Sequence, residues 1–227
     1  MAQITKSLLL KGSLLMLMTF CVNARTVTFG ATEWCPYSCS ALKDGGIVTS
    51  KVRGILKDHG INLKVKFLPW KRAVQLINDG ELDGLLTAVK EEVPYMRLTS
   101  YPAETYRSCL FGKKDDKRII TKEMIPSLDI ALIDGYSYGP LFDKLIQGNQ
   151  GHFTKLGGSN TQKRMYKMMK LNRVDYILED ERVALFHNPN QLSLKICAKK
   201  RPFFVAISPQ LQDVEKVLEI LNLGLKP

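Results

Sequence analysis

The stretch FLPWKRA at residues 67–73, followed by GELDGLL at residues 80–86, decides the fold. Before it, apolar and polar residues alternate over 62–67, the period of a half-buried strand. After it, Ala73, Val74 and Ile77 form an apolar stripe at helical spacing, and Gly80 stands where a helix cap belongs. The stretch predicts a strand, a short helix and a buried strand. Trp70 then lies at the edge where open α/β sheets bind ligands, with packing in the core as the alternative.

Strands and helices alternate along the rest of the chain. We expect strands at 25–32, 107–111, 128–133, 153–156, 174–178, 192–197 and 203–208. Helices are expected after Gly46, at 140–147, around Met165, and from about residue 211 to the end, and 112–118 has the composition of a surface linker. Such alternation is typical of parallel, doubly wound α/β sheets.

The first 24 residues have the features of a cleavable signal peptide. Lys6 and Lys11 precede an apolar run that is too short to cross a bilayer, and 22–24 offer a cleavage site after Ala24. A lipoprotein signal ending at Cys21 is disfavoured because the bulky Phe20 precedes that cysteine. We therefore expect an exported, periplasmic protein.

The net charge is strongly positive. It is +11 for the whole chain, and residues 1–24 contain two lysines and no acidic residue, so the remainder carries +9. The basic residues are scattered and are not interleaved with aromatics, which disfavours nucleic-acid binding. Anionic ligands or surfaces, or solubility alone, remain as explanations.

Five cysteines become four when Cys21 leaves with the signal peptide. Four cysteines allow three pairings, and the sequence alone does not choose among them. Cys35 and Cys39 are close in sequence, which leaves Cys109 and Cys197. In an oxidising compartment disulfides are favoured over a metal site, and no histidine stands at ligand spacing beside a cysteine. We expect neither a metal nor a cofactor.

The ordered set of motifs resembles the family 3 periplasmic solute-binding proteins, the polar amino acid type with the type 2 periplasmic-binding-protein fold. The matching segments are 34–37, 45–48, 67–73, 80–84, 99–102, 134–139 and 172–181, and the resemblance covers the whole mature chain. It implies two α/β lobes, residues 25–110 plus 205–227 and residues 111–204. Two crossover strands near 107–113 and 203–208 would form a hinge beside the ligand cleft. Cys109 and Cys197 lie near both crossings, so we expect a disulfide there; two unpaired buried thiols are the rival.

The resemblance also points to ligand-binding residues. Amino-acid-binding members hold the ligand carboxylate with an Arg that has no counterpart here, and Lys90 is the nearest cation. Asp180 stands where the family places the carboxylate for the α-ammonium, with Glu179 beside it; an acidic helix start is the alternative. The backbone N–H groups of 135–139 would open a helix and could bind an anion. The further candidates are Trp34, Tyr37, Trp70, Arg72, Thr87, Tyr136, Ser137, Tyr138 and Ser159.

Three functions follow as hypotheses. The favoured one is a monomeric, non-enzymatic protein that captures a small polar solute for an inner-membrane permease or a sensor. The second is a dehydratase-like enzyme on the same fold, with Glu179 or Asp180 as general acid or base. The third is an interaction or signalling module without a small ligand.

Overall fold

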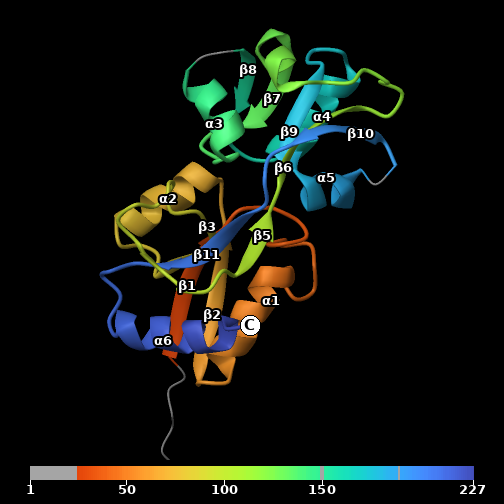
Figure 1. The fold of residues 1–227 in the computed structure, drawn as a ribbon. Helices are drawn as coiled ribbons and strands as arrows, with labels where there is room; N and C mark the ends of the chain where they lie inside the picture. Colours follow the sequence, from red (N-terminus) through yellow and green to blue (C-terminus); the bar gives the residue numbers. More distant parts are fainter. Residues whose placement is uncertain (1–24, 149–150, 189) are drawn as a thin grey trace, which may run out of the picture.

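The computed structural model describes residues 25–148, 151–188 and 190–227. The chain forms two β-sheets with helices packed on them, and the two halves lie one above the other in Figure 1. The two-lobed α/β architecture expected from the sequence is therefore confirmed. The predicted signal peptide lies outside the described residues. Within the described ranges, no helix is long and apolar enough to cross a bilayer.

The first sheet is covered by helices on both faces. Its strands are β1 (Arg25–Ala31), β2 (Ile61–Phe67), β3 (Gly84–Ala88), β4 (Arg97–Leu98), β5 (Glu104–Tyr106) and β11 (Arg201–Ile207), in the order β2-β1-β3-β11-β4 with β5 paired to β11. The helices are α1 (Ile47–Lys57), α2 (Trp70–Asn78) and α6 (Val214–Leu225). Leu85 packs with α2, whereas its neighbour Leu86 packs with α1 and α6. Since successive side chains of a strand point to opposite faces, all of β3 is buried.

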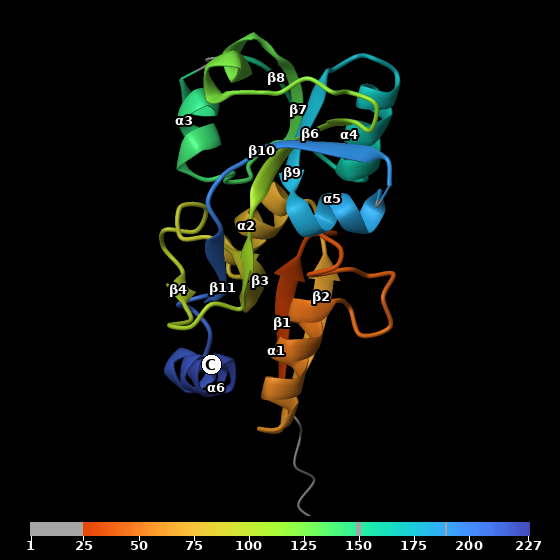
Figure 2. The same ribbon diagram turned by 45° about the vertical axis from the view of Figure 1, so that its right-hand side comes forward.

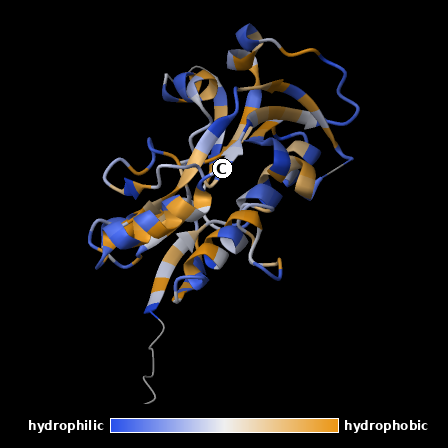
Figure 3. Ribbon diagram, turned by 60° about the horizontal axis from the view of Figure 1, so that its bottom comes forward, coloured by the Kyte–Doolittle hydropathy of each residue, from blue (hydrophilic) through white to orange (hydrophobic). Residues whose placement is uncertain are grey.

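The deciding stretch folds as predicted. It forms β2, α2 and β3, and α2 begins directly after Pro69. At the end of α2, Gly80 N–H donates to Ile77 O at 3.2 Å and Glu81 N–H donates to Leu76 O at 2.8 Å, which is the Schellman pattern. Gly80 has φ 76°, a left-handed conformation that favours glycine. Figure 3 shows both hydrophobic and hydrophilic residues along the helices, as expected for helices with one buried face.

The second sheet contains β6 (Ser108–Lys113), β7 (Asp129–Ile133), β8 (His152–Leu156), β9 (Tyr176–Asp180) and β10 (Leu192–Cys197), in the order β10-β6-β9-β7-β8. Its helices are α3 (Pro140–Gln147), α4 (Thr161–Lys170) and α5 (Glu181–His187), with a 3-10 turn, η1 (Lys122–Ser127). Figure 2 shows α5 at the end of this half that faces the first sheet.

The expectation of parallel, doubly wound sheets is met by only three strands of each sheet. Strands β1, β2 and β3 pair in parallel, and so do β7, β8 and β9. In contrast β11 runs antiparallel to β3, and β6 runs antiparallel to both β9 and β10. Strands β6 and β11 are the first strands that the chain forms after passing from one sheet to the other. Each enters its new sheet against the direction of the parallel set, and the alternating sequence pattern does not reveal that direction.

The chain passes between the sheets twice. It passes first at Arg107, between β5 and β6, and again at 198–200, between β10 and β11, which is a few residues before the expected range of 203–208. The disulfide Cys109–Cys197 joins β6 to β10 directly beside these passages, so the expected bond is confirmed. Cys35 and Cys39 form the second disulfide.

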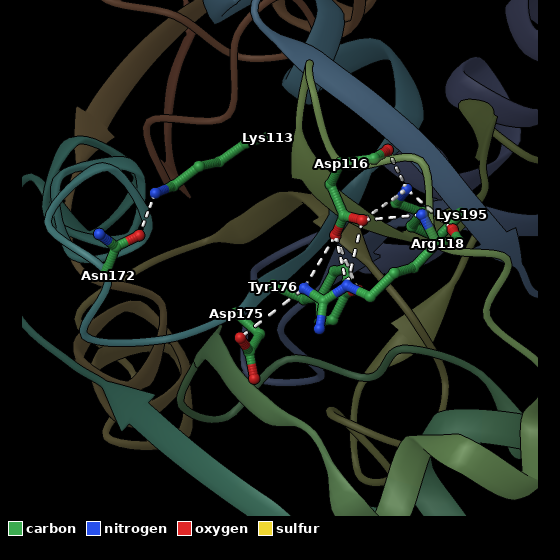
Figure 4. Close-up of polar contacts among 7 residues, drawn as sticks. All are labelled: Lys113, Asp116, Arg118, Asn172, Asp175, Tyr176 and Lys195. Atoms are coloured by element: carbon green, nitrogen blue, oxygen red, sulfur yellow. Dashed lines mark hydrogen bonds and ion pairs between the residues drawn. The ribbon is translucent and has the colours of Figure 1, made fainter.

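The segment 112–118, expected as a surface linker, is exposed at Lys114, Asp115, Lys117 and Arg118, but it is part of the second sheet's own fold. Gly112 and Lys113 end β6, and the turn that follows is held by Asp116 (Figure 4). The Asp116 carboxylate accepts hydrogen bonds from Arg118 N–H at 2.9 Å and from the Tyr176 hydroxyl at 2.8 Å. Lys195 Nζ, nearly buried, lies 3.6 Å from the same carboxylate. Hydrogen bonds from Arg118 and Tyr176 hold the pKa of Asp116 well below its usual range.

We expect Asp116→Asn to lower the free energy of unfolding by about 1–3 kcal/mol, because it leaves Lys195 without its carboxylate partner and weakens the turn. Urea unfolding at pH 7 measures this difference. The neighbouring Asp115 is exposed, so Asp115→Asn serves as the matched control and should change stability by less than about 0.5 kcal/mol. Equal effects of the two substitutions would show that the network does not stabilise the fold.

Candidate functional site

A cavity of about 30 Å³ lies where the two sheets face each other, with room for one or two water molecules. Several strands of both sheets end at it: Trp34 follows β1, Trp70 follows β2, Tyr136 follows β7 and Glu179 lies at the end of β9. The carboxyl ends of strands are where α/β sheets hold ligands. The cavity is therefore the candidate site.

Eight of the predicted residues line this cavity, and four do not. Those at the cavity are Trp34, Trp70, Thr87, Tyr136, Ser137, Tyr138, Glu179 and Asp180. Tyr37 packs behind Trp34, with ring centroids 4.6 Å apart. Arg72 is exposed on α2 and bonds Gln75 at 3.1 Å, and Lys90 and Ser159 are exposed.

Sequence reasoning missed six other lining residues: Thr32, Val89, Glu92, Tyr106, Ser108 and Phe203. Glu92 lies two residues after Lys90, and its place at the cavity depends on its contact with Ser137 of the second half. Tyr106 and Ser108 flank Arg107 at the first passage between the sheets. Their position inside or next to the expected crossing at 107–113 is the sequence signal that points to them.

Glu179 is the most deeply buried acid of the site, with 1% of its surface exposed. Its Oε1 accepts hydrogen bonds from Asp180 N–H at 2.9 Å and from Trp34 Nε1–H at 3.4 Å. Its Oε2 is buried and has no hydrogen-bond partner among the described residues. Burial, assisted by repulsion from Asp180, raises the pKa of Glu179 to about 8. The site therefore contains a carboxyl group that favours its protonated form near neutral pH.

Asp180 fixes the local backbone. Its Oδ1 accepts from Val183 N–H at 3.0 Å, which caps α5, and its Oδ2 accepts from Arg107 N–H at 2.9 Å. Both oxygens thus have backbone partners, as expected for an acidic residue at the start of a helix. Asp180 ties the start of α5 to the first passage between the sheets.

The loop before α3 already holds carboxylates of this chain. Ser137 N–H donates to Glu92 at 2.7 Å, and Tyr138 N–H and Gly139 N–H donate to Asp143 at 2.7 and 3.1 Å. These are among the N–H groups that the sequence offered to a ligand anion. Burial raises the pKa of Glu92 to about 8, although repulsion from Asp143 contributes and hydrogen bonds oppose it.

Polar contacts between the two halves surround the cavity. The Tyr136 hydroxyl donates to Thr32 Oγ1 at 3.2 Å, and Gln162 donates to Glu33 O at 2.9 Å. Ion pairs join Lys71 to Asp134 at 2.5 Å and Arg182 to Glu104 at 3.2 Å. Each pair joins a residue of the first half to one of the second, so the structure is a closed arrangement.

Comparison with solved structures shows which known proteins share this fold. No family model matches the sequence, and no curated protein matches it. Among solved structures, a mutant of ArgBP from T. maritima has a TM-score of 0.73 at 15% identity, over 88% of this chain and 87% of that chain. An ancestral arginine-binding protein bound to arginine has a TM-score of 0.73 at 18% identity, over 88% and 90%. The fold is theirs.

A third similar structure is the ancestral amino acid-binding protein AncCDT-1, a precursor of cyclohexadienyl dehydratase. Its TM-score is 0.69 at 17% identity, over 88% of each chain. These likenesses confirm the two-lobed fold that the sequence motifs implied.

Proposed function

We propose that this protein captures a small polar solute between its two lobes. The observation that carries the proposal is a cavity at the strand ends, lined from both sheets by aromatic and acidic side chains. Arginine-binding proteins of the same fold support it. Consistent with the sequence, the mature chain would be exported to the periplasm and act as a monomer that delivers its solute to a permease or a sensor.

Capture requires the lobes to move. A cavity of about 30 Å³ is smaller than any amino acid, so a ligand enters only when the halves separate or when Tyr136 and its neighbours shift. The two passages at Arg107 and at 198–200 are the natural hinge, and the Cys109–Cys197 bond holds them together on the side of the second sheet. A ligand that contacts both lobes stabilises the closed state by its differential affinity.

A thermal-shift screen of the purified protein tests this function. The library contains amino acids, amines, organic acids and short peptides at concentrations up to about 100 times an expected micromolar Kd. A ligand at 100 times its Kd stabilises the folded state by about 2.7 kcal/mol, so at least one compound should raise the unfolding midpoint by several degrees. A flat result across the library contradicts solute capture and favours the interaction module.

An enzymatic role is the second candidate. It is favoured by two carboxyl groups, the buried Glu179 and the half-buried Glu92, whose pKa of about 8 suits a general acid near neutral pH. It is also favoured by the likeness to AncCDT-1. Incubating each stabilising compound with the protein and analysing the mixture by mass spectrometry separates the two roles. We expect release of the unchanged compound; a product that disappears in Glu179→Gln would establish catalysis.

A further inference from the structure

We propose that the cavity takes a small organic amine, a cation without a carboxylate group. This rests on the proposed function, because it names the ligand class of the same cleft. The class follows from the charge of the walls, from the partners of the loop before α3, from unpaired buried groups and from the aromatic rings.

Apart from the tyrosines, the ionisable side chains that line the cavity are all carboxylic acids. They are Glu92, Glu179 and Asp180, and in the part of the chain that the structure describes no Lys, Arg or His lines it. A ligand carboxylate placed here would face these acids without a lining cation to balance it. An ammonium group would instead favour the ionised form of these carboxyl groups and pair with it.

The positions where a ligand carboxylate would dock are occupied by the protein itself. The N–H groups of Ser137, Tyr138 and Gly139 bind the carboxylates of Glu92 and Asp143. Arg201 reaches the Ser137 hydroxyl at 3.4 Å, but its guanidinium is paired with Glu91 at 2.5 Å. A ligand carboxylate would have to displace these partners, whereas an amine would not.

Three buried polar atoms at the cavity have no hydrogen-bond partner among the described residues: Glu179 Oε2, the Tyr106 hydroxyl and Trp70 Nε1. Each belongs to a residue at most 5% exposed. Once Glu179 is ionised, its Oε2 can accept a hydrogen bond from an ammonium group, as can the Tyr106 oxygen, and Trp70 Nε1–H can donate to a hydroxyl of the ligand. Because unpaired buried polar groups are costly, a ligand that pairs them gains affinity.

Aromatic rings complete the walls. Trp34 lies 5.5 Å from Phe203 and 6.3 Å from Tyr136 between ring centroids, and Trp70 lies 6.5 Å from Tyr136. Aromatic faces attract organic cations and cover the apolar part of an amine. The acidic and aromatic walls therefore suit the two ends of the same ligand.

Matched pairs of compounds test the proposal directly. Calorimetric titration at pH 7.5 compares cadaverine with lysine, agmatine with arginine and tyramine with tyrosine, since each pair differs by a carboxylate. We expect at least one amine to bind at least tenfold more tightly than its amino acid. An amino acid that binds as tightly as its amine, or more tightly, overturns the proposal.

Variants locate the binding. Glu179→Gln keeps the shape of the side chain and should weaken the amine at least tenfold, and Tyr106→Phe should weaken it severalfold. Glu219→Gln, on the exposed face of α6, should leave the affinity unchanged. Amine affinity that is unaffected by both cavity substitutions overturns the proposal, and thermal unfolding of each variant checks that it is folded.

The possible failures differ from one another. If carboxylate-bearing solutes alone stabilise the protein, and Arg201→Gln abolishes their effect, the cleft still captures a solute but the ligand class is wrong. If no compound of the whole library binds, the proposed function itself falls and the amine proposal falls with it.

Discussion

Replacing Cys109 and Cys197 together by serine lowers the free energy of unfolding by about 4.6 kcal/mol. The bond closes a loop with a sequence separation of 88 residues, and the loss of loop entropy in the unfolded chain grows with that length. The bond also joins β6 to β10 beside both passages between the sheets. Urea unfolding of the oxidised protein and of the double variant measures the difference.

The second disulfide provides the control. Cys35 and Cys39 are separated by only four residues, for which the same model gives about 2 kcal/mol. The Cys35→Ser and Cys39→Ser double variant should therefore lose less than half as much stability. Equal losses would show that loop entropy does not explain the contribution of the longer bridge.

Raising the pH from 5 to 9 should destabilise the protein, and Glu179→Gln should reduce that loss by at least about 1.4 kcal/mol, the equivalent of one pKa unit. The pKa of Glu179 is about 8 in the folded protein and near 4.5 when the group is unperturbed. Between these values the folded state binds more protons than the unfolded state, so its stability is greatest at low pH and falls as the pH rises. Urea unfolding at both pH values provides the comparison.

The surroundings of Glu179 leave its charge uncompensated. Asp180 repels it through its carboxyl group, the hydroxyls of Tyr136, Tyr138 and Tyr166 face it as neutral groups, and its hydrogen-bond donors are the N–H groups of Trp34 and of the Asp180 backbone. Glu92 titrates in the same range in both proteins, so its contribution cancels in the comparison. The exposed Glu219→Gln should follow the wild-type curve. Parallel curves for wild type and Glu179→Gln would contradict the assigned burial.

The fold was largely predictable because its signals are local. The Gly80 cap, the stripe of α2 and the continuous burial of β3 each follow from residues near one another in sequence. The direction of β6 and β11 was not predictable, since the alternation of apolar residues is the same for parallel and antiparallel strands. The direction of these two strands depends on how the chain enters each sheet after crossing from the other one.

The site was predictable only in outline. Trp34, Trp70 and Glu179 follow strand ends, and the strand-end rule finds them. Arg72 does not line the cavity because it lies on the exposed side of α2. Glu92 was not predicted because its role at the cavity depends on its contact with Ser137 of the other lobe. Such contacts between distant segments depend on how the lobes close.

Tryptophan emission offers the most direct test of capture between the lobes. The chain has two tryptophans, Trp34 and Trp70, and both line the cavity. Titration with the compound that gives the largest thermal shift should change the emission saturably, with the same midpoint as in calorimetry. A compound that stabilises the protein while the emission stays constant, or a library without any stabilising compound, would contradict binding in the cleft.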